Sequence, residues 1–216
     1  GKVASVVAEL LAGSGAIIIG VSTIEGMISS ENGLDVQTLL SLKNEFGDRL
    51  VHHYPAVEVT APESLYSLDV DLLIPGARPR VINEKNVSSI EAKWIVPIAN
   101  APATWEAEKS LDEMGILFIP DFVANCGGIL SSAMRGDNFD LEDVRYLVET
   151  TFAELVFALL QESELRGESF KEFVRAVTWQ NHLMLSDPST GFTGMRKRLP
   201  QLIKDRDWHG VKSRIG

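Results

Sequence analysis

The sequence predicts an α/β protein: a doubly wound, mostly parallel sheet of the Rossmann type, followed by an α-helical C-terminal segment. Short apolar runs at residues 16–21, 69–74, 93–98 and 116–119 have the length and composition of buried strands. Helical patterns lie between the first two runs and between the last two, and only helical spacing is found beyond about residue 141. Because strands that alternate with helices pair in parallel through right-handed crossovers, we expect one continuous sheet.

The chain begins with an amphipathic helix. Its apolar residues recur at helical spacing at Val3, Val6, Val7, Leu10 and Leu11, and Gly13 and Gly15 then mark its end. After the first strand we expect a polar loop at residues 22–33. A helix then carries Val36, Leu39, Leu40 and Phe46, and another helix at residues 103–115 precedes the last strand.

Two parts are expected along the chain. Residues 1–135 are predicted to form a Rossmann-like domain that lacks its first strand, since such a sheet normally opens with a strand, a glycine turn and a helix, and here the helix comes first. Residues 136–216 are predicted to form a helical segment packed on the same domain. Its helical patterns cover residues 141–167 and 169–186, and a turn is expected at 187–191.

Composition places the chain among soluble globular proteins. Of its 216 residues 45% are hydrophobic and 23% charged, and no apolar run approaches the roughly 18 residues of a membrane helix. The single cysteine excludes an internal disulfide, and the first residues are too polar for a secretory signal. We therefore expect a cytoplasmic protein with no membrane partner.

Charge argues against nucleic acid as a partner. The net charge of −10 opposes attraction to a phosphate backbone, although local backbone donors can still hold an anionic cofactor. The one basic cluster, residues 195–206, is interpreted as a solvated helix face, with an anion patch as the alternative. The four histidines and one cysteine are scattered, so no metal site is predicted.

A ligand edge is predicted beyond the last strand, where Asn125, Cys126, Gly127 and Gly128 follow Pro120. In parallel sheets, ligands sit beyond the carboxyl ends of the strands, where backbone poor in side chains can approach them. Cys126 is interpreted as a small apolar filler, because no histidine lies near it in the sequence to activate a nucleophile.

The first four residues fit the last four places of a GxGxxG/A turn, which binds a pyrophosphate at a helix N-terminus. They are Gly1, Lys2, Val3 and Ala4. The alternative is that the terminal glycine is a cloning remnant.

Four stretches occur in the order found in one enzyme family. They are GKVASVVAELLAGSGAIIIGVS, DVDLLIPGARPRVINEKN, KWIVPIANAPATWEAEKSL and GILFIPDFVANCGGILSS. From the first residue to about Ser132 the chain resembles the C-terminal NAD(P)-binding domain of the glutamate, leucine, phenylalanine and valine dehydrogenases, and is most like glutamate dehydrogenase. The resemblance implies an oxidoreductase that deaminates an L-amino acid to a 2-oxo acid and ammonia, with NAD or NADP as hydride acceptor.

The resemblance also implies a set of cofactor-binding residues. They are Gly1, Lys2, Val3, Ala4, Ser22, Thr23, Pro75, Gly76, Ala77, Asn100 and Asn125. The first four line the pyrophosphate turn, residues 75–77 approach the adenosine side, and the two asparagines lie near the nicotinamide and its ribose. Ser132 resembles the residue that binds the carboxylate of the amino acid.

Two departures from the family limit what it implies. Ser22 and Thr23 stand where the family often has an acidic residue for the adenosine ribose, which leaves NAD against NADP open, with Glu25 as a substitute carboxylate. Pro97 and Ile98 replace the usual Glu and Gly, and proline cannot donate to a central strand ladder. We therefore expect a reshaped nicotinamide side.

No catalytic residue is predicted in this chain. The family's catalytic lysine and aspartate belong to an N-terminal domain, so the chain alone is expected to be inactive and to meet its amino-acid substrate through that missing domain. Lys85, Lys93, His52 and His53 are interpreted as surface residues. We expect a homo-oligomer. The alternatives are a noncatalytic interaction or regulatory module and, disfavoured because no acid/base pair is evident, a small enzyme of other chemistry.

Overall fold

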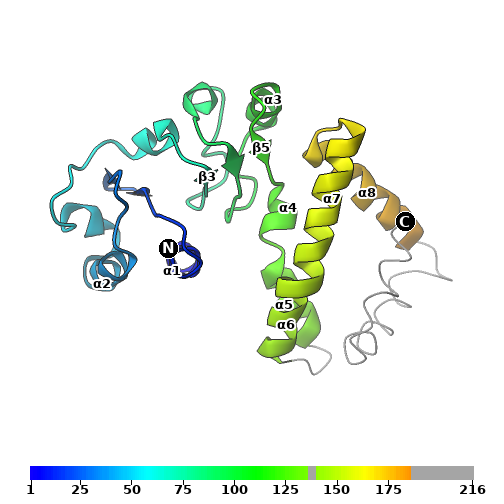
Figure 1. Cartoon of the computed structure of the whole chain (residues 1–216), viewed down its shortest axis with the longest axis horizontal. Helices are drawn as coiled ribbons and strands as arrows, with labels where there is room; N and C mark the ends of the chain where they lie inside the picture. The colour runs from blue at the N-terminus through cyan, green and yellow to red at the C-terminus, as the bar shows by residue number, and fades with distance from the viewer. Residues whose placement is uncertain (136–139, 186–216) are drawn as a thin grey trace. The chain divides into compact units, whose positions relative to one another are not determined.

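The computed structural model describes residues 1–135 and 140–185 (Figure 1). The chain divides into two compact units, Gly1–Asn125 and Cys126–Gly216. The first unit contains all the strands found in the described residues, and the second is helical there. The predicted α/β class is therefore confirmed.

The first helix, α1 (Lys2–Gly13), confirms the predicted opening helix. Its end is marked by Ser14, whose N–H donates to the carbonyls of the last turn. No residue of α1 is buried, and Val3, Val6 and Leu10 are 60%, 54% and 62% exposed. Since these residues recur at i, i+3 and i+7, one apolar face of the helix lies uncovered in this unit.

A β-hairpin replaces the predicted polar loop at residues 22–33. Strands β1 (Gly20–Thr23) and β2 (Gly26–Ser29) pair antiparallel, with Val21 opposite Ile28. The loop prediction is wrong at Gly26–Ser29 because Met27 and Ile28 are buried, and Met27 exchanges two backbone hydrogen bonds with Thr60, far along the chain. Only the end of the predicted strand at residues 16–21 is strand in the structure.

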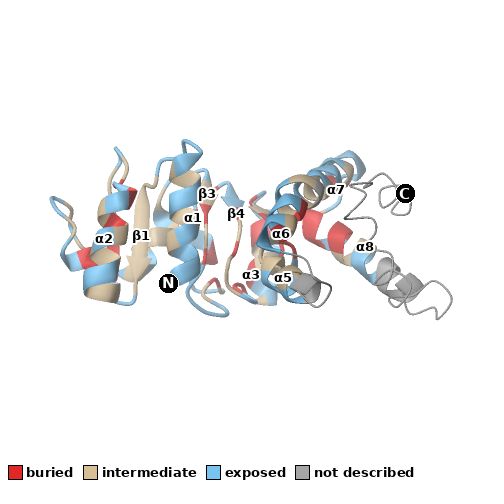
Figure 2. Cartoon of the chain, turned by 90° about the horizontal axis from the view of Figure 1, so that it is seen from below, coloured by how far each residue is buried: buried red, intermediate tan, exposed pale blue. Residues whose placement is uncertain are grey.

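A small core lies under the hairpin (Figure 2). Helix α2 (Val36–Phe46) begins at Asp35, whose side chain accepts the N–H of Thr38, and the 3₁₀ turn η1 (Gly47–His52) follows it. The buried residues of this core are Ile28, Leu34, Leu39, Leu50 and Val51. They join the hairpin, α2 and η1 into one packed group.

The second sheet of the first unit is parallel, in the order β3-β4-β5. Its strands are β3 (Leu72–Leu73), β4 (Trp94–Ile95) and β5 (Leu117–Phe118). The 3₁₀ turns η2 (Pro62–Ser67) and η3 (Val87–Ser89) precede β3 and β4, and α3 (Trp105–Glu113), capped by Thr104, precedes β5. Its core includes the fully buried Ile82, Ile95 and Leu111.

A proline explains why β4 is shorter than predicted at its carboxyl end. Pro75, Pro97 and Pro120 each stand two residues beyond a strand end. The N–H groups of Trp94, Val96 and Ile98 donate to carbonyls of β3 and of the residues just before and after it. Successive residues of a strand face opposite neighbours, so Pro97 faces β5. A proline there has no N–H to donate, and the pairing between β4 and β5 ends.

The continuous doubly wound sheet is not observed in the described residues. The two-stranded and three-stranded sheets are separate, because β1 pairs only with β2 and no strand joins β1 to β3. The observed arrangement is an antiparallel hairpin and a short parallel sheet within one unit.

The short helix α4 (Asp121–Ala124) closes the first unit, and the second contains helices α5 (Gly127–Arg135), α6 (Leu141–Leu147), α7 (Ala153–Arg166) and α8 (Phe170–Leu185). A π-helical turn, η4 (Val148–Phe152), links α6 to α7. Asp140 starts α6 with a capping box, and Gly167, with φ of 65°, ends α7. The predicted helical character is confirmed in the described residues, whereas the basic cluster at 195–206 and the turn at 187–191 lie outside them. None of the described helices has the length and apolar character needed to cross a membrane.

Candidate functional site

The loops after β3 and β4 lie against each other at the carboxyl ends of these strands. The N–H groups of Ile98 and Ala99 both donate to the carbonyl of Pro75, at 3.1 and 3.2 Å. A Cβ added at Gly76 would lie 2.7 Å from Cγ1 and Cδ1 of Ile98, so the absence of a side chain permits this approach. The structure thus brings the predicted residues Pro75 and Gly76 next to the segment that leads to Asn100.

Two predicted residues meet at the ends of β4 and β5. The side chain of Asn125 donates through Nδ2 to Oδ1 of Asn100 at 2.6 Å. Within the described residues, Oδ1 of Asn125 and Nδ2 of Asn100 have no hydrogen-bond partner, and Asn100 is exposed. The pair therefore presents one acceptor and one donor, the combination that a primary carboxamide such as that of nicotinamide requires.

A carboxylate that the sequence prediction did not single out supports this pair. Oδ2 of Asp121 accepts the N–H of Ala101 at 2.7 Å, and the backbone carbonyl of Asp121 accepts the N–H of Asn125 at 2.8 Å. We call Asn100, Asn125 and Asp121 the amide edge. Asp121 lies four residues before Asn125 and directly after Pro120, and this position is the only local indication of its role.

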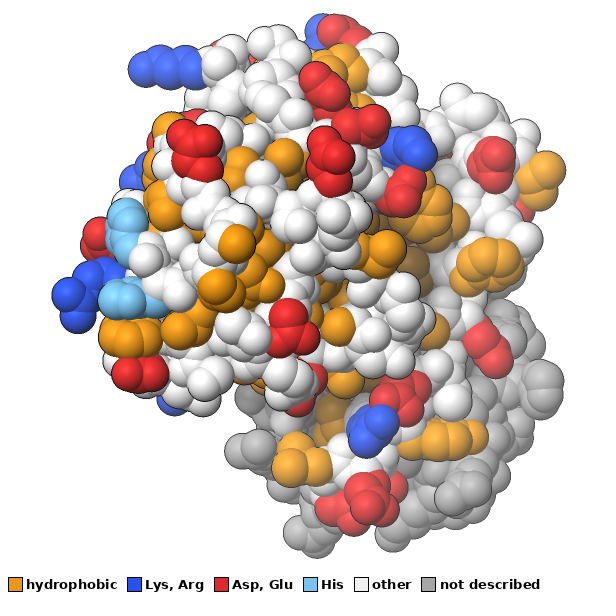
Figure 3. Space-filling view, turned by 60° about the vertical axis from the view of Figure 1, so that its left-hand side comes forward, with side chains coloured by type: hydrophobic (Ala, Val, Ile, Leu, Met, Phe, Trp, Pro, Cys, Tyr) orange, Lys and Arg blue, Asp and Glu red, His pale blue; other side chains and the backbone are white. Residues whose placement is uncertain are grey.

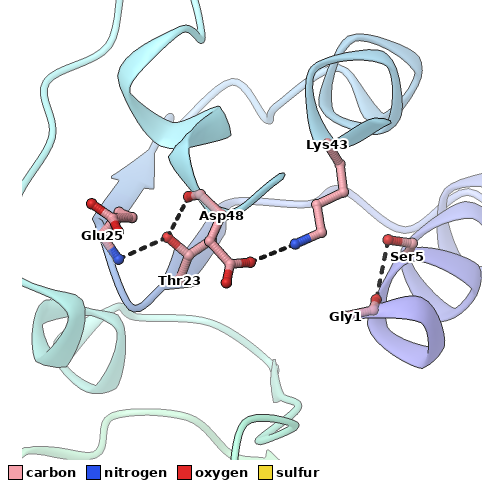
Figure 4. A network of polar contacts seen from close by, with 6 residues as sticks. All are labelled: Gly1, Ser5, Thr23, Glu25, Lys43 and Asp48. Atoms are coloured by element: carbon pink, nitrogen blue, oxygen red, sulfur yellow. Dashed lines mark hydrogen bonds and ion pairs between the residues drawn. The ribbon is translucent and has the colours of Figure 1, made fainter. Parts of the chain in front are cut away.

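The end of β1 is organised by hydroxyl groups (Figure 4). The hydroxyl of Ser22 donates to the carbonyl of Pro62 at 3.0 Å. The hydroxyl of Thr23 donates to the carbonyl of Asp48 at 2.8 Å and accepts the N–H of Glu25 at 3.1 Å. The single proton of each hydroxyl is therefore used inside the protein, and Thr23 attaches η1 to the end of the strand.

This attachment brings an ion pair to the end of β1. Nζ of Lys43, on α2, lies 2.5 Å from Oδ1 of Asp48, with the two side chains 24% and 46% exposed. We call Thr23, Lys43 and Asp48 the charged edge. The hydrogen bond and charge of Lys43 lower the pKa of Asp48, which keeps this carboxylate ionised. Neither charged residue was predicted, because both are 20 or more positions from Thr23 and belong to no local motif.

The start of α1 lies within electrostatic reach of the charged edge (Figure 4). Gly1 precedes the helix without a side-chain cap, and by helix geometry the N–H groups of residues 2–4 have no intrahelical acceptor. All four predicted residues of the pyrophosphate turn are exposed. An anion can therefore reach these donors.

Other predicted residues are less informative. Ala77 is exposed beyond β3, and Glu25 is exposed at the hairpin turn, where its backbone and not its carboxylate contacts Thr23. Ser132 lies exposed on α5 in the second unit, and its role stays a prediction. Burial raises the pKa of Cys126, which favours the thiol and supports its interpretation as a filler.

Surface charge and cavities add little to the site. On the face drawn in Figure 3, basic side chains are scattered among acidic and hydrophobic ones and do not gather into a patch. A shallow hollow lies between the end of α1 and the start of α2, and none of the predicted cofactor residues lines it. Among the described residues, no group of three or more His, Cys, Asp or Glu could hold a metal ion.

The fold and the amide edge define an α/β protein with polar loops at the carboxyl ends of parallel strands, a class in which such loops bind ligands. Residues 1–169 match the Glutamate/Leucine/Phenylalanine/Valine dehydrogenase family, and the chain belongs to that family. The predicted family is thereby confirmed.

Two relatives are NADP-specific glutamate dehydrogenases. The chain is 40% identical over 138 residues to that of Saccharolobus shibatae, a match that covers 64% of this chain and 32% of the relative. It is 36% identical over 132 residues to glutamate dehydrogenase A1 of Halobacterium salinarum, covering 61% of this chain and 31% of the relative. The chain thus spans about a third of the length of these relatives. Their names agree with the predicted cofactor class, NAD or NADP.

A solved structure supports the same family. The hetero-hexameric glutamate dehydrogenase of Thermus thermophilus, in a Leu-bound form, superposes with a TM-score of 0.69 at 27% identity. The match covers 80% of this chain and 42% of that chain. This likeness includes most of the described residues and supports the α/β fold.

Proposed function

We propose that this chain is the C-terminal NAD(P)-binding part of a glutamate-type amino-acid dehydrogenase, which orients the cofactor for oxidative deamination of an L-amino acid to a 2-oxo acid. The observation that carries the proposal is the contact between Asn100 and Asn125 at the ends of two adjacent parallel strands. When bound, the nicotinamide accepts the hydride from the amino acid. The two amides hold its carboxamide, and residues 1–4 offer backbone donors to the pyrophosphate.

The charged edge favours NADP in this proposal. Ser22 and Thr23 bring no carboxylate to the end of β1, and the carboxylate that does lie there, Asp48, is neutralised by Lys43. A 2′-phosphate is then not repelled, and Lys43 supplies a counter-charge next to the start of α1. The NADP-specific names of two relatives agree with this preference.

The domain organisation is also part of the proposal. We propose that residues 1–135 belong to a Rossmann-like domain in which a further strand joins β1 to β3, completing a doubly wound sheet and covering the apolar face of α1. The separate sheets and the exposed Val3, Val6 and Leu10 support this arrangement. The helical part, residues 136–216, packs on the same domain.

Residues outside this chain complete the enzyme in the proposal. No acid/base pair is assigned among the described residues, so the proton transfers of deamination come from another domain, and the chain alone binds cofactor without turnover. That domain also holds the amino acid, and Ser132 contacts its carboxylate. We propose a cytoplasmic homo-oligomer; the hexameric state of the Thermus relative supports oligomerisation.

A paired titration tests the proposal. The chain is titrated with NADPH and NADH while nicotinamide fluorescence is followed, with Asn125→Ala and, as a matched control, the exposed Asn32→Ala. We expect saturable binding that Asn125→Ala weakens about tenfold, because its hydrogen bonds to the carboxamide are lost, and that the control leaves unchanged. If a folded chain binds neither dinucleotide, the proposal is wrong, and the noncatalytic interaction module becomes the better interpretation.

A further inference from the structure

Asp121 is the residue through which the two loops of the amide edge are joined. Its side chain reaches the loop after β4, where Oδ2 accepts the N–H of Ala101 at 2.7 Å. Its main chain belongs to the loop after β5, where its carbonyl accepts the N–H of Asn125 at 2.8 Å. One residue therefore contacts both segments that carry the asparagines.

The hydrogen bond from Ala101 to Asp121 stabilises the loop after β4, whose backbone is strained. Ala101 has φ of 43° and Arg80 has φ of 56°, in the left-handed region that costs a residue with a side chain on the order of 1 kcal/mol or more. The N–H of Arg80 donates to the carbonyl of Ala101 at 2.8 Å, so each residue stabilises the backbone conformation of the other. With the carboxylate of Asp121 on its N–H, Ala101 is fixed from both sides, and so is the peptide that follows Asn100.

This geometry determines which amide atoms face a ligand. The contact of 2.6 Å between Nδ2 of Asn125 and Oδ1 of Asn100 requires both side chains to keep one orientation. It leaves Oδ1 of Asn125 as an acceptor and Nδ2 of Asn100 as a donor. If the loop after β4 relaxed, the hydrogen bond between the two amides would break. Each amide could then adopt two orientations, and binding the ligand would cost the entropy of restricting both.

We infer that Asp121 is a positioning residue for the nicotinamide carboxamide, acting through Asn100 and Asn125 and not by touching the cofactor. The inference rests on the proposed function, because it concerns the same site and assigns the positioning of its two amides to a third residue. Its consequence is selective: loss of the carboxylate weakens binding of the nicotinamide half of the cofactor and leaves binding of the adenosine half intact.

Calorimetric titration with two ligands tests this selectivity. The ligands are NADPH and 2′-phospho-ADP-ribose, which lacks only the nicotinamide. For Asp121→Ala we expect the Kd of NADPH to rise about tenfold and the Kd of 2′-phospho-ADP-ribose to change less than about twofold. Asp121→Asn is the conservative variant, and we expect it to restore NADPH binding to within about threefold, because its amide oxygen can still accept the N–H of Ala101.

A double-mutant cycle shows whether Asp121 acts through the asparagines. In an Asn125→Ala background, Asp121→Ala should raise the Kd of NADPH by no more than about twofold. If Asp121→Ala loses its thermal transition, Asp121→Ser replaces it, since serine keeps a polar side chain at the first residue of α4 but is shorter and withdraws from Ala101.

The outcomes separate the inference from the proposal beneath it. A wild-type chain that binds neither ligand overturns both. A wild-type chain that binds both ligands, with variants that weaken the two equally or not at all, overturns only the inference, and so does a full tenfold loss in the Asn125→Ala background.

Discussion

The two edges of the first unit are built in different ways. The amide edge takes its residues from loops directly after two neighbouring parallel strands, and its contacts are hydrogen bonds to amides and backbone. The charged edge combines Thr23 from a strand, Lys43 from a helix and Asp48 from a 3₁₀ turn. One hydrogen bond from the Thr23 hydroxyl to a backbone carbonyl and one ion pair stabilise it. A strand-end site can therefore come from local motifs or from long-range packing within the same unit.

Glycine substitutions are expected to give the largest effects and to separate the two regions. Gly26, at the hairpin, has φ of 147°, and a Cβ there would lie 2.4 Å from Cγ1 of Val59 and 3.1 Å from the carbonyl oxygen of Thr60. Gly26→Ala is therefore both strained and overpacked, and we expect it to lower the free energy of unfolding by more than about 2 kcal/mol. Chemical denaturation measures the loss.

Two other glycines serve as matched controls for this prediction. Gly47 has φ of 62° but open space around it, and Gly76 meets only the side chain of Ile98. We expect Gly47→Ala and Gly76→Ala to cost about 1 kcal/mol each, the first through conformation and the second through a contact that a flexible side chain can relieve. A loss at Gly76 equal to that at Gly26 would mean that the parallel region is as tightly constrained as the hairpin.

Lys43→Met tests whether the charged edge selects the cofactor. Methionine keeps most of the length of the side chain and removes its charge, so we expect the Kd of NADPH to rise about tenfold while that of NADH changes little. Fluorescence titration with both dinucleotides gives the ratio. In contrast, Asn125→Ala at the amide edge should weaken both dinucleotides alike, because both carry the nicotinamide.

Asp48→Asn provides the opposite change at the same edge. It removes the partner that neutralises Lys43, so the NADPH preference should increase or stay the same. A fall in that preference would show that Asp48 holds Lys43 in its binding position, and the proposed role of Lys43 would then belong to the ion pair as a whole.

The amide edge could be predicted from the sequence because its residues stand beside strands that the sequence also predicts. Asn100 and Asn125 each follow an apolar run and a proline, and β4 and β5 lie within the predicted ranges. The position where the pairing between β4 and β5 ends depends on Pro97, whose missing N–H group is evident from the sequence. What the sequence did not indicate is that Asp121 bonds Ala101, a contact across 20 residues.

The hairpin and the charged edge could not be predicted in the same way. Residues 26–29 contain only two apolar side chains among polar neighbours, and they form a strand because Met27 pairs with Thr60 and Ile28 enters a core with Leu50 and Val51. Long-range contacts of this kind override local composition. Lys43 and Asp48 follow from the same packing, which places the end of α2 and the start of η1 beside Thr23.

The smallest expected effect is the pH dependence of the charged edge. Lys43 lowers the pKa of folded Asp48 below its ordinary value of 3.8, so the ion pair stabilises the protein above that value and the contribution disappears as pH falls through the folded pKa. Because both side chains are partly exposed, we expect less than about 1 kcal/mol. Thermal unfolding at pH 7 and pH 3 should therefore show a slightly smaller acid-induced loss for Asp48→Asn than for wild type. As a control, Asp71→Asn beside β3, whose partner Lys93 is 68% exposed, should change the thermal unfolding at pH 7 by less than Asp48→Asn does. An equal effect at both pairs would mean that the covered position of Lys43 adds nothing, and the two regions would then differ in geometry but not in electrostatics.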